Sequence, residues 1–145
     1  MTAVGDQLRR LVTAEVQLRG VGEARASAIP SSGHWTRKEI LGHLIDSAAN
    51  NHQRFVRLQL AAAVEFPGYA QDAWVRAQNC QSVSWNDLVD LWVAYNRHLS
   101  HVVDQIMPEA AGHVWKSPDG DLTLEFLVKD YVRHTQHHLR QILAG

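Results

Sequence analysis

Histidines recur at a helical spacing near the end of the chain, in the sequence Tyr131-Val-Arg-His134-Thr-Gln-His137-His138. His134 and His138 lie four residues apart, so on a helix both imidazoles share one face, about 40° apart around the axis. Such a pair can bind one metal ion. A third imidazole, His43 in an earlier segment, would complete a three-histidine site that keeps coordination positions open. Open positions are typical of a catalytic metal rather than a structural one.

The pair of histidines does not by itself decide between a metal site and a structural role. His134 and His138 lie at the edge of an apolar stripe, where hydrogen-bonded core histidines are an equally good interpretation. His137 lies further round the helix, in a polar row with Asp130, and is expected at the surface or in support of the site. The metal hypothesis therefore depends on whether His43 lies at the same depth along the helices as His134 and His138.

Composition limits the classes of protein that the chain can belong to. Its 145 residues are 46% hydrophobic, which predicts one domain over residues 1–145 with a sizeable core. The net charge is −1, which argues against a nucleic-acid partner. The single cysteine, Cys80, excludes an internal disulfide and fits the cytoplasm. No signal peptide and no apolar run of roughly 20 residues is present, so no membrane partner is expected.

Apolar periodicity predicts an all-α fold with four long helices, and no alternating segment competes as a strand. Thr36 and Glu39 form a capping box at the start of the second helix. Ile29-Pro30 and Ser117-Pro-Asp-Gly120 are break and turn signals. The expected helices cover residues 4–27, 37–63, 84–106 and 123–144.

The connection over residues 64–83 indicates the topology. It is too long for a tight hairpin and can cross the bundle from end to end, which makes the second and third helices parallel. The resulting four-helix bundle is up-down-down-up. His43 lies roughly 10 Å into its helix, and the His134–His138 pair lies roughly 10 Å from the end of the last helix. The three imidazoles meet only if these helices are antiparallel, which this topology provides.

Polar residues beside the histidines are candidates for a pocket. A polar row on the second helix is either a solvated flank or the floor of a pocket, in which Arg54 would bind an anionic substrate group. In the long connection, Trp74 either forms a pocket wall or closes the bundle end. Aspartates near the ligands either orient imidazoles or lie at the surface. The candidates are Asp46, Ser47, Asn50, Asn51, Arg54, Tyr69, Asp72, Trp74, Asp130 and Tyr131.

At these residues the chain resembles the DinB/YfiT-like superfamily of metal-binding four-helix bundles. The matching segments are Trp35-Thr-Arg-Lys-Glu-Ile-Leu-Gly-His43-Leu-Ile-Asp46 and Tyr131-Val-Arg-His134-Thr-Gln-His137-His138-Leu-Arg-Gln141-Ile. The family pattern combines an early His-Leu with a late His-x-x-x-His-x-x-Gln-Ile, so His43, His134 and His138 take the ligand positions. The chain is less similar to a zincin, because Thr135 follows His134 where His-Glu-x-x-His has its glutamate.

The resemblance implies an up-down-down-up bundle with a divalent metal on three histidines, and frequently a homodimer. Some relatives transfer low-molecular-weight thiols such as bacillithiol or mycothiol, and one branch is a thiol-dependent isomerase. The expected function is therefore a metal-dependent thiol S-transferase acting on small electrophiles. The alternatives are a metal-dependent hydrolase of a small amide or ester and a non-catalytic metal- or ligand-binding bundle. Zn and Ni are the favoured metals, and Fe and Mn also suit three imidazoles. No catalytic residue beyond the ligands stands out.

Overall fold

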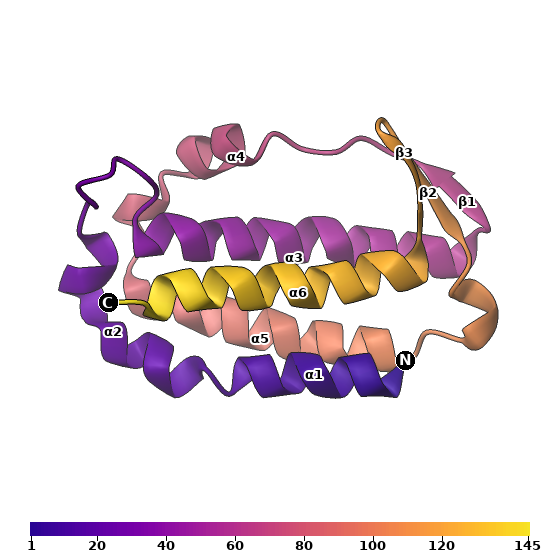
Figure 1. Cartoon of the computed structure of the whole chain (residues 1–145), viewed down its shortest axis with the longest axis horizontal. Helices are drawn as coiled ribbons and strands as arrows, with labels where there is room; N and C mark the ends of the chain where they lie inside the picture. The colour runs from indigo at the N-terminus through magenta and orange to yellow at the C-terminus, as the bar shows by residue number, and fades with distance from the viewer.

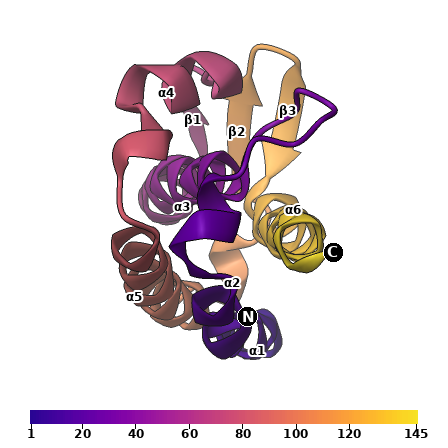
Figure 2. The same ribbon diagram turned by 90° about the vertical axis from the view of Figure 1, so that its left-hand side faces the viewer.

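The computed structural model describes all 145 residues, and its helices pack as a four-helix bundle (Figure 1). The end-on view places α3, α5, α6 and the α1–α2 pair at the four corners (Figure 2). Helix α5 packs against α1, α2 and α3, and α6 packs against α3. The bundle helices are α1 (Thr2–Val12), α2 (Glu15–Ser27), α3 (Arg37–Leu60), α5 (Trp85–Asp104) and α6 (Leu124–Leu143).

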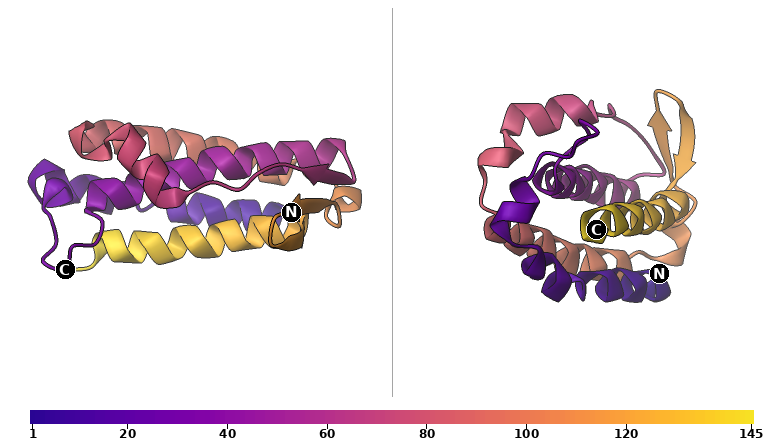
Figure 3. Two further views of the ribbon diagram at one scale, coloured as in Figure 1. Left: turned by 90° about the horizontal axis from the view of Figure 1, so that it is seen from above. Right: turned by 60° about the vertical axis from the view of Figure 1, so that its left-hand side comes forward.

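The helices follow the up-down-down-up order, as predicted. In Figure 1, α1 and α6 run toward the end where the C-terminus lies, and α3 and α5 run away from it. After α3 the chain returns along the outside of the bundle before α5 begins, and this connection contains a short helix, α4 (Gln71–Gln78). As a result, α3 and α6 are antiparallel neighbours, and α4 packs on α3 (Figure 3).

The first predicted helix is in fact two helices. The chain turns at Thr13 and Ala14, between α1 and α2. Within α2, Gly22 has φ 75° and ψ 161°, outside the helical region. Glycine adopts this conformation without a steric penalty, and its low helix propensity lets tertiary packing break the helix. The apolar periodicity continues across Thr13 and Ala14, so periodicity alone predicted one helix.

A small three-stranded sheet lies at one end of the bundle, so the prediction that no strand forms was wrong (Figure 1). Its strands are β1 (Ala63–Glu65), β2 (Val114–Ser117) and β3 (Gly120–Thr123). β1 pairs with β2 in parallel, and β2 pairs with β3 in antiparallel fashion across the predicted turn. Strands of three or four residues are too short to produce a readable alternation. The second helix correspondingly ends at Leu60, three residues earlier than predicted.

Capping side chains determine where the site-bearing helices begin. Thr36 accepts a hydrogen bond from the Glu39 backbone amide at 3.2 Å, and its own amide donates to the Glu39 carboxylate at 3.0 Å. This capping box confirms the predicted start of α3 and fixes the depth of His43. The hydroxyl of Thr123 caps α6 in a similar way, at 3.1 Å from the Phe126 amide. No helix is long and apolar enough to cross a membrane.

Candidate metal centre

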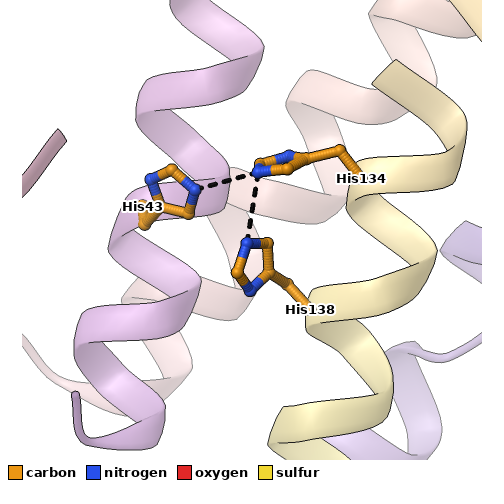
Figure 4. Close-up of side chains that lie close together, drawn as sticks. All are labelled: His43, His134 and His138. Atoms are coloured by element: carbon orange, nitrogen blue, oxygen red, sulfur yellow. Dashed lines mark hydrogen bonds between the residues drawn. The ribbon is translucent and has the colours of Figure 1, made fainter. Parts of the chain in front are cut away.

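Three imidazoles converge between α3 and α6 (Figure 4). His43 Nε2 lies 3.1 Å from His134 Nε2, and His138 Nε2 lies 3.1 Å from the same atom. One ring nitrogen from each histidine lies within 4.8 Å of the other two. The antiparallel arrangement of α3 and α6 therefore brings together the three residues that sequence spacing singled out.

The geometry fits a metal ion better than it fits hydrogen bonding alone. A ring nitrogen carries either one hydrogen or one lone pair, so His134 Nε2 cannot make full hydrogen bonds to both neighbours at once. Tetrahedral ligands at the usual Zn–N distance of about 2.0–2.1 Å lie roughly 3.3 Å apart. Two of the three separations, at 3.1 Å, are close to that value, and the third lies within 4.8 Å. The three histidines can therefore hold a divalent cation with small adjustments.

Burial keeps these imidazoles neutral. Burial, together with the neighbouring imidazoles of His134 and His138, lowers the pKa of His43 to about 4. Burial also lowers the pKa of His134 to about 4 and shifts that of His138 downward. A metal binds the neutral form of histidine. At neutral pH, all three lone pairs are therefore available without the loss of a proton.

Gln141 orients His138 and was not assigned a role from the sequence. Its Oε1 lies 2.7 Å from His138 Nδ1, in the position to accept a hydrogen bond, and its Nε2 lies 3.3 Å from His137 Nε2. A proton on His138 Nδ1 leaves the lone pair on Nε2, which faces the other two imidazoles. The signal available in the sequence was the spacing, because a residue three positions after a helical ligand lies on its face. His137 is exposed, as expected; its ring lies 5.1 Å from that of His138, centroid to centroid, and Gln141 is its hydrogen-bond partner.

His43 is held by tight packing. Its side chain is 1% exposed, and the ring of Trp35 lies 5.0 Å from its ring, centroid to centroid. The preceding residue is Gly42, where a Cβ atom would come 2.5 Å from Cys80 Sγ. The structure thus places Trp35 directly against a candidate ligand. His43 Nδ1 is buried without a hydrogen-bond partner, so packing rather than a hydrogen bond holds the side of the ring that faces away from His134.

Two hollows adjoin the three histidines, and α4 contributes to both. The hollow beside His138 has a volume of about 770 Å³. It is lined by Gly33, His34, Trp35, Glu39, Ile40, Asp72, Arg76, His138 and Gln141. The hollow beside His134 has a volume of about 230 Å³. It is lined by Ser47, Asn51, Arg54, Gly68, Tyr69, Gln71, Leu127, Asp130, Tyr131 and His134. Seven of the ten candidate pocket residues therefore line one of these hollows.

The other three candidates have different positions. Asp46 accepts two hydrogen bonds from Gln78 Nε2, at 2.9 and 3.0 Å, and so ties α4 to α3. Asn50 donates to the Asp46 carbonyl at 2.8 Å, within its own helix. Trp74 is 40% exposed and packs against Tyr69, with ring centroids 5.0 Å apart. In the structure, neither Asp46 nor Asn50 hydrogen-bonds to a ligand imidazole.

Arg54 is buried without a carboxylate partner. Its side chain is 9% exposed, and its guanidinium lies 4.0 Å from the centre of the Trp115 ring. Its Nη1 makes one long hydrogen bond, 3.4 Å, to Asn51 Oδ1, and its Nε has no partner. Burial lowers the pKa of Arg54, although an arginine remains charged at neutral pH. A buried cation is costly unless an anion pairs with it.

Fold and site together place the chain among known proteins. The family model of the DinB superfamily matches residues 6–142, and the chain belongs to this superfamily. A similar solved structure is YfiT from Bacillus subtilis, described as a probable metal-dependent hydrolase with an unusual four-helix bundle topology. The TM-score is 0.76 at 20% sequence identity, covering 96% of this chain and 83% of that one. No curated protein matches the sequence significantly.

Proposed function

We propose that the protein is a metal-dependent thiol S-transferase acting on small electrophiles, with His43, His134 and His138 as the metal ligands. The observation that carries the proposal is the convergence of three neutral imidazoles between two hollows. Three neutral ligands leave the full positive charge of a divalent cation uncompensated. A cation bound there would lower the pKa of a thiol or of water and so supply a nucleophile.

The protein's own groups supply the remaining functions. Gln141 holds the His138 ring in the tautomer that presents Nε2. The buried ring of His43 and the packed Trp35 limit access of bulk water from one side of the triad. The hollows beside His138 and His134 give two co-substrates separate approaches to the same three nitrogens.

A thiol nucleophile suits this site because few free carboxylates surround it. Glu39 is engaged in the capping box, Asp46 accepts from Gln78, and Asp130 pairs with Arg133. A metal ion lowers the pKa of bound water from about 15.7 to about 7, so bound water is only partly deprotonated at neutral pH. A thiol starts at a pKa of about 8.5, so metal binding alone is enough to deprotonate it at neutral pH.

A metal-dependent hydrolase of a small amide or ester is the second candidate, and one observation favours it. Asp72 lines the larger hollow and makes no ion pair or hydrogen bond, so a general base is available on the His138 side. The similarity to YfiT, described as a probable metal-dependent hydrolase, agrees with this alternative. Asp72→Asn would then abolish hydrolysis, whereas thiol transfer would not need this carboxylate.

The deciding experiment compares the two nucleophiles on one sample. Metal-loaded protein is incubated with a model electrophile together with bacillithiol, mycothiol or glutathione, and in parallel with small esters and amides without a thiol. We expect conjugation that requires both the metal and one of the thiols. His134→Ala should abolish it, while the exposed neighbour His137→Ala should retain most of it. Ester or amide cleavage without a thiol would replace this proposal with the hydrolase.

Failure of both reactions in a metal-loaded sample would contradict both enzymatic proposals and favour a non-catalytic metal- or ligand-binding bundle. Zn and Ni remain the proposed metals, and Fe and Mn also suit the ligand set. A homodimer and a cytoplasmic location are further proposals, which rest on the family likeness and on the single cysteine.

A further inference from the structure

The buried guanidinium of Arg54 lacks the charged partner that a buried cation usually has. It makes no ion pair. Every other buried or half-buried arginine or lysine hydrogen-bonds to a carboxylate or to a backbone carbonyl; Lys38, for example, pairs with Glu23. Removing a cation from water without pairing it with an anion is energetically unfavourable. A cost of this kind is usually offset by an anion, whereas the hydrogen-bond partner of Arg54 is the neutral amide of Asn51, at 3.4 Å.

The surroundings of Arg54 are arranged for an anion. One face of the guanidinium lies on the Trp115 ring at 4.0 Å, and Phe66 lies 6.0 Å from it, so two aromatic rings hold its plane. A guanidinium held by its face keeps an edge free for bidentate hydrogen bonds. The side chain lines the same 230 Å³ hollow as His134. The only acidic residue in that lining, Asp130, pairs with Arg133.

We infer that Arg54 binds the carboxylate of a small acidic substrate whose reacting end lies at the three histidines. The inference rests on the proposed function, because it takes the triad as the reacting centre. A carboxylate matches the single positive charge and the planar fork of the guanidinium, whereas a dianionic phosphate would keep an uncompensated charge near Asp130. The hollow is smaller than the roughly 300–1,000 Å³ of pockets for drug-sized ligands, so the substrate is small.

Helix geometry sets the distance between the two ends of this substrate. Arg54 follows His43 by eleven residues, a rise of roughly 16 Å along α3 with a rotation of only about 20°. Long side chains on a helix lean toward its N-terminus, which shortens the gap. The carboxylate therefore lies roughly 10–16 Å from the triad, on the same side of α3. Ser47 and Tyr69, which line the hollow between them, provide hydroxyl groups along the way.

The first test uses metal-free protein and therefore does not depend on the triad. Calorimetry compares octanoate with octanol, which differ only in the carboxylate. We expect octanoate to bind at least tenfold more tightly, and Arg54→Met to remove this preference. The matched control is Arg57→Met, an exposed arginine on the same helix, which should keep it. Equal binding of the two probes to the wild-type protein, or a preference that survives in Arg54→Met, would overturn the inference.

Stability separates a binding role from a structural one. Because the cation is unpaired, Arg54→Met should leave the melting temperature of the ligand-free protein unchanged or raise it. A lowered melting temperature together with an intact octanoate preference would show that Arg54 is structural. If Arg54→Met does not fold, Arg54→Lys decides, since lysine keeps the charge but loses the bidentate fork; undiminished octanoate binding in that variant would contradict the proposed geometry.

A second test measures the spacing between the two sites. Co²⁺-loaded protein is titrated with mercaptooctanoate and with mercaptopropionate, and the thiolate-to-cobalt absorption band reports binding of the sulfur. Only the longer probe can span both sites, so Arg54→Met should weaken it at least tenfold and leave the shorter one unchanged. If the wild-type protein does not bind Co²⁺ but still prefers octanoate, only the metal proposal is refuted. Intact Co²⁺ and thiol binding with no effect of Arg54→Met would refute the carboxylate site alone.

Discussion

The amide oxygen of Gln141 lies 2.7 Å from His138 Nδ1, and His138 Nε2 lies 3.1 Å from His134 Nε2. Gln141 thus orients the ring of the candidate ligand His138 through Nδ1, the nitrogen that faces away from the other two imidazoles. The neighbouring candidate ligand His43 has no such partner on its Nδ1 and is held by burial instead. The two sides of the triad therefore differ in how firmly hydrogen bonding sets the ring orientation.

Gln141→Ala should weaken metal binding by about 10–100-fold without changing the helical content, because the amide that fixes the His138 tautomer is lost. Isothermal titration with Zn²⁺ measures the affinity, and circular dichroism measures the helix content. Gln136→Ala, an exposed glutamine on the same helix, is the matched control. An affinity equal to that of the wild-type protein would mean that Gln141 does not support the site.

Purified protein should bind about one divalent metal ion per chain through the three converging imidazoles. Elemental analysis of His43→Ala, His134→Ala and His138→Ala should show a large loss of metal in each variant, because two imidazoles make a much weaker site than three. His137→Ala should retain its metal, since its ring lies outside the triad. Full occupancy in His43→Ala together with loss in His137→Ala would contradict the ligand assignment.

Removal of the metal should weaken the fold without unfolding it. The apolar faces of the bundle helices form two large buried clusters, which do not depend on an ion. Far-ultraviolet circular dichroism with and without a strong chelator should show nearly equal helix content, with a lower melting temperature after chelation. Complete loss of helix on chelation would show instead that the metal is structural.

Metal-free protein should lose stability as the pH falls from above 6.5 toward 4. The folded-state pKa of His43 is about 4, below its ordinary value of 6.5, so the unfolded state takes up the proton first. At about pH 4.5 this single group costs about 2–3 kcal/mol relative to about pH 7.5. Urea unfolding at the two pH values measures the loss. His43→Gln should show a smaller loss, and an identical pH dependence in both proteins would exclude this histidine as the cause.

Gly42→Ala should destabilise the protein by about 1–3 kcal/mol, the usual range for overpacking. A Cβ atom there would come 2.5 Å from Cys80 Sγ and 3.2 Å from Cys80 Cβ, so the adjacent helix turn at His43 must move. Gly20→Ala is the control, because nothing lies within 4 Å of its added methyl group. We expect that change to stabilise α2 by about 0.4–1 kcal/mol. Chemical denaturation measures both values. An unchanged free energy of unfolding in Gly42→Ala would show that α3 and Cys80 move apart at little cost.

Several parts of the fold follow from local sequence. The starts of α3 and α6, the turn at Ser117–Gly120 and the long crossover were all predictable, because caps, turns and apolar periodicity act over a few residues. The antiparallel pairing of α3 and α6 followed from the requirement that three histidines meet at one depth. Membership of the DinB superfamily followed from the spacing of the same histidines together with the Gln141-Ile pair.

Other features depend on contacts between distant segments. Tertiary packing produces the break between α1 and α2, although the apolar pattern continues across it. Packing also produces the three-stranded sheet, although its strands show no readable alternation of apolar and polar residues. Trp35 lies against His43 because the loop before α3 folds back on the site. Arg54 was recognisable as a candidate anion-binding residue, but its burial on Trp115 requires β2 to pack across the end of α3. Sequence spacing thus determined which histidines could share an ion, and only tertiary packing decided which side chains surround them, because the partners come from segments with no local relationship.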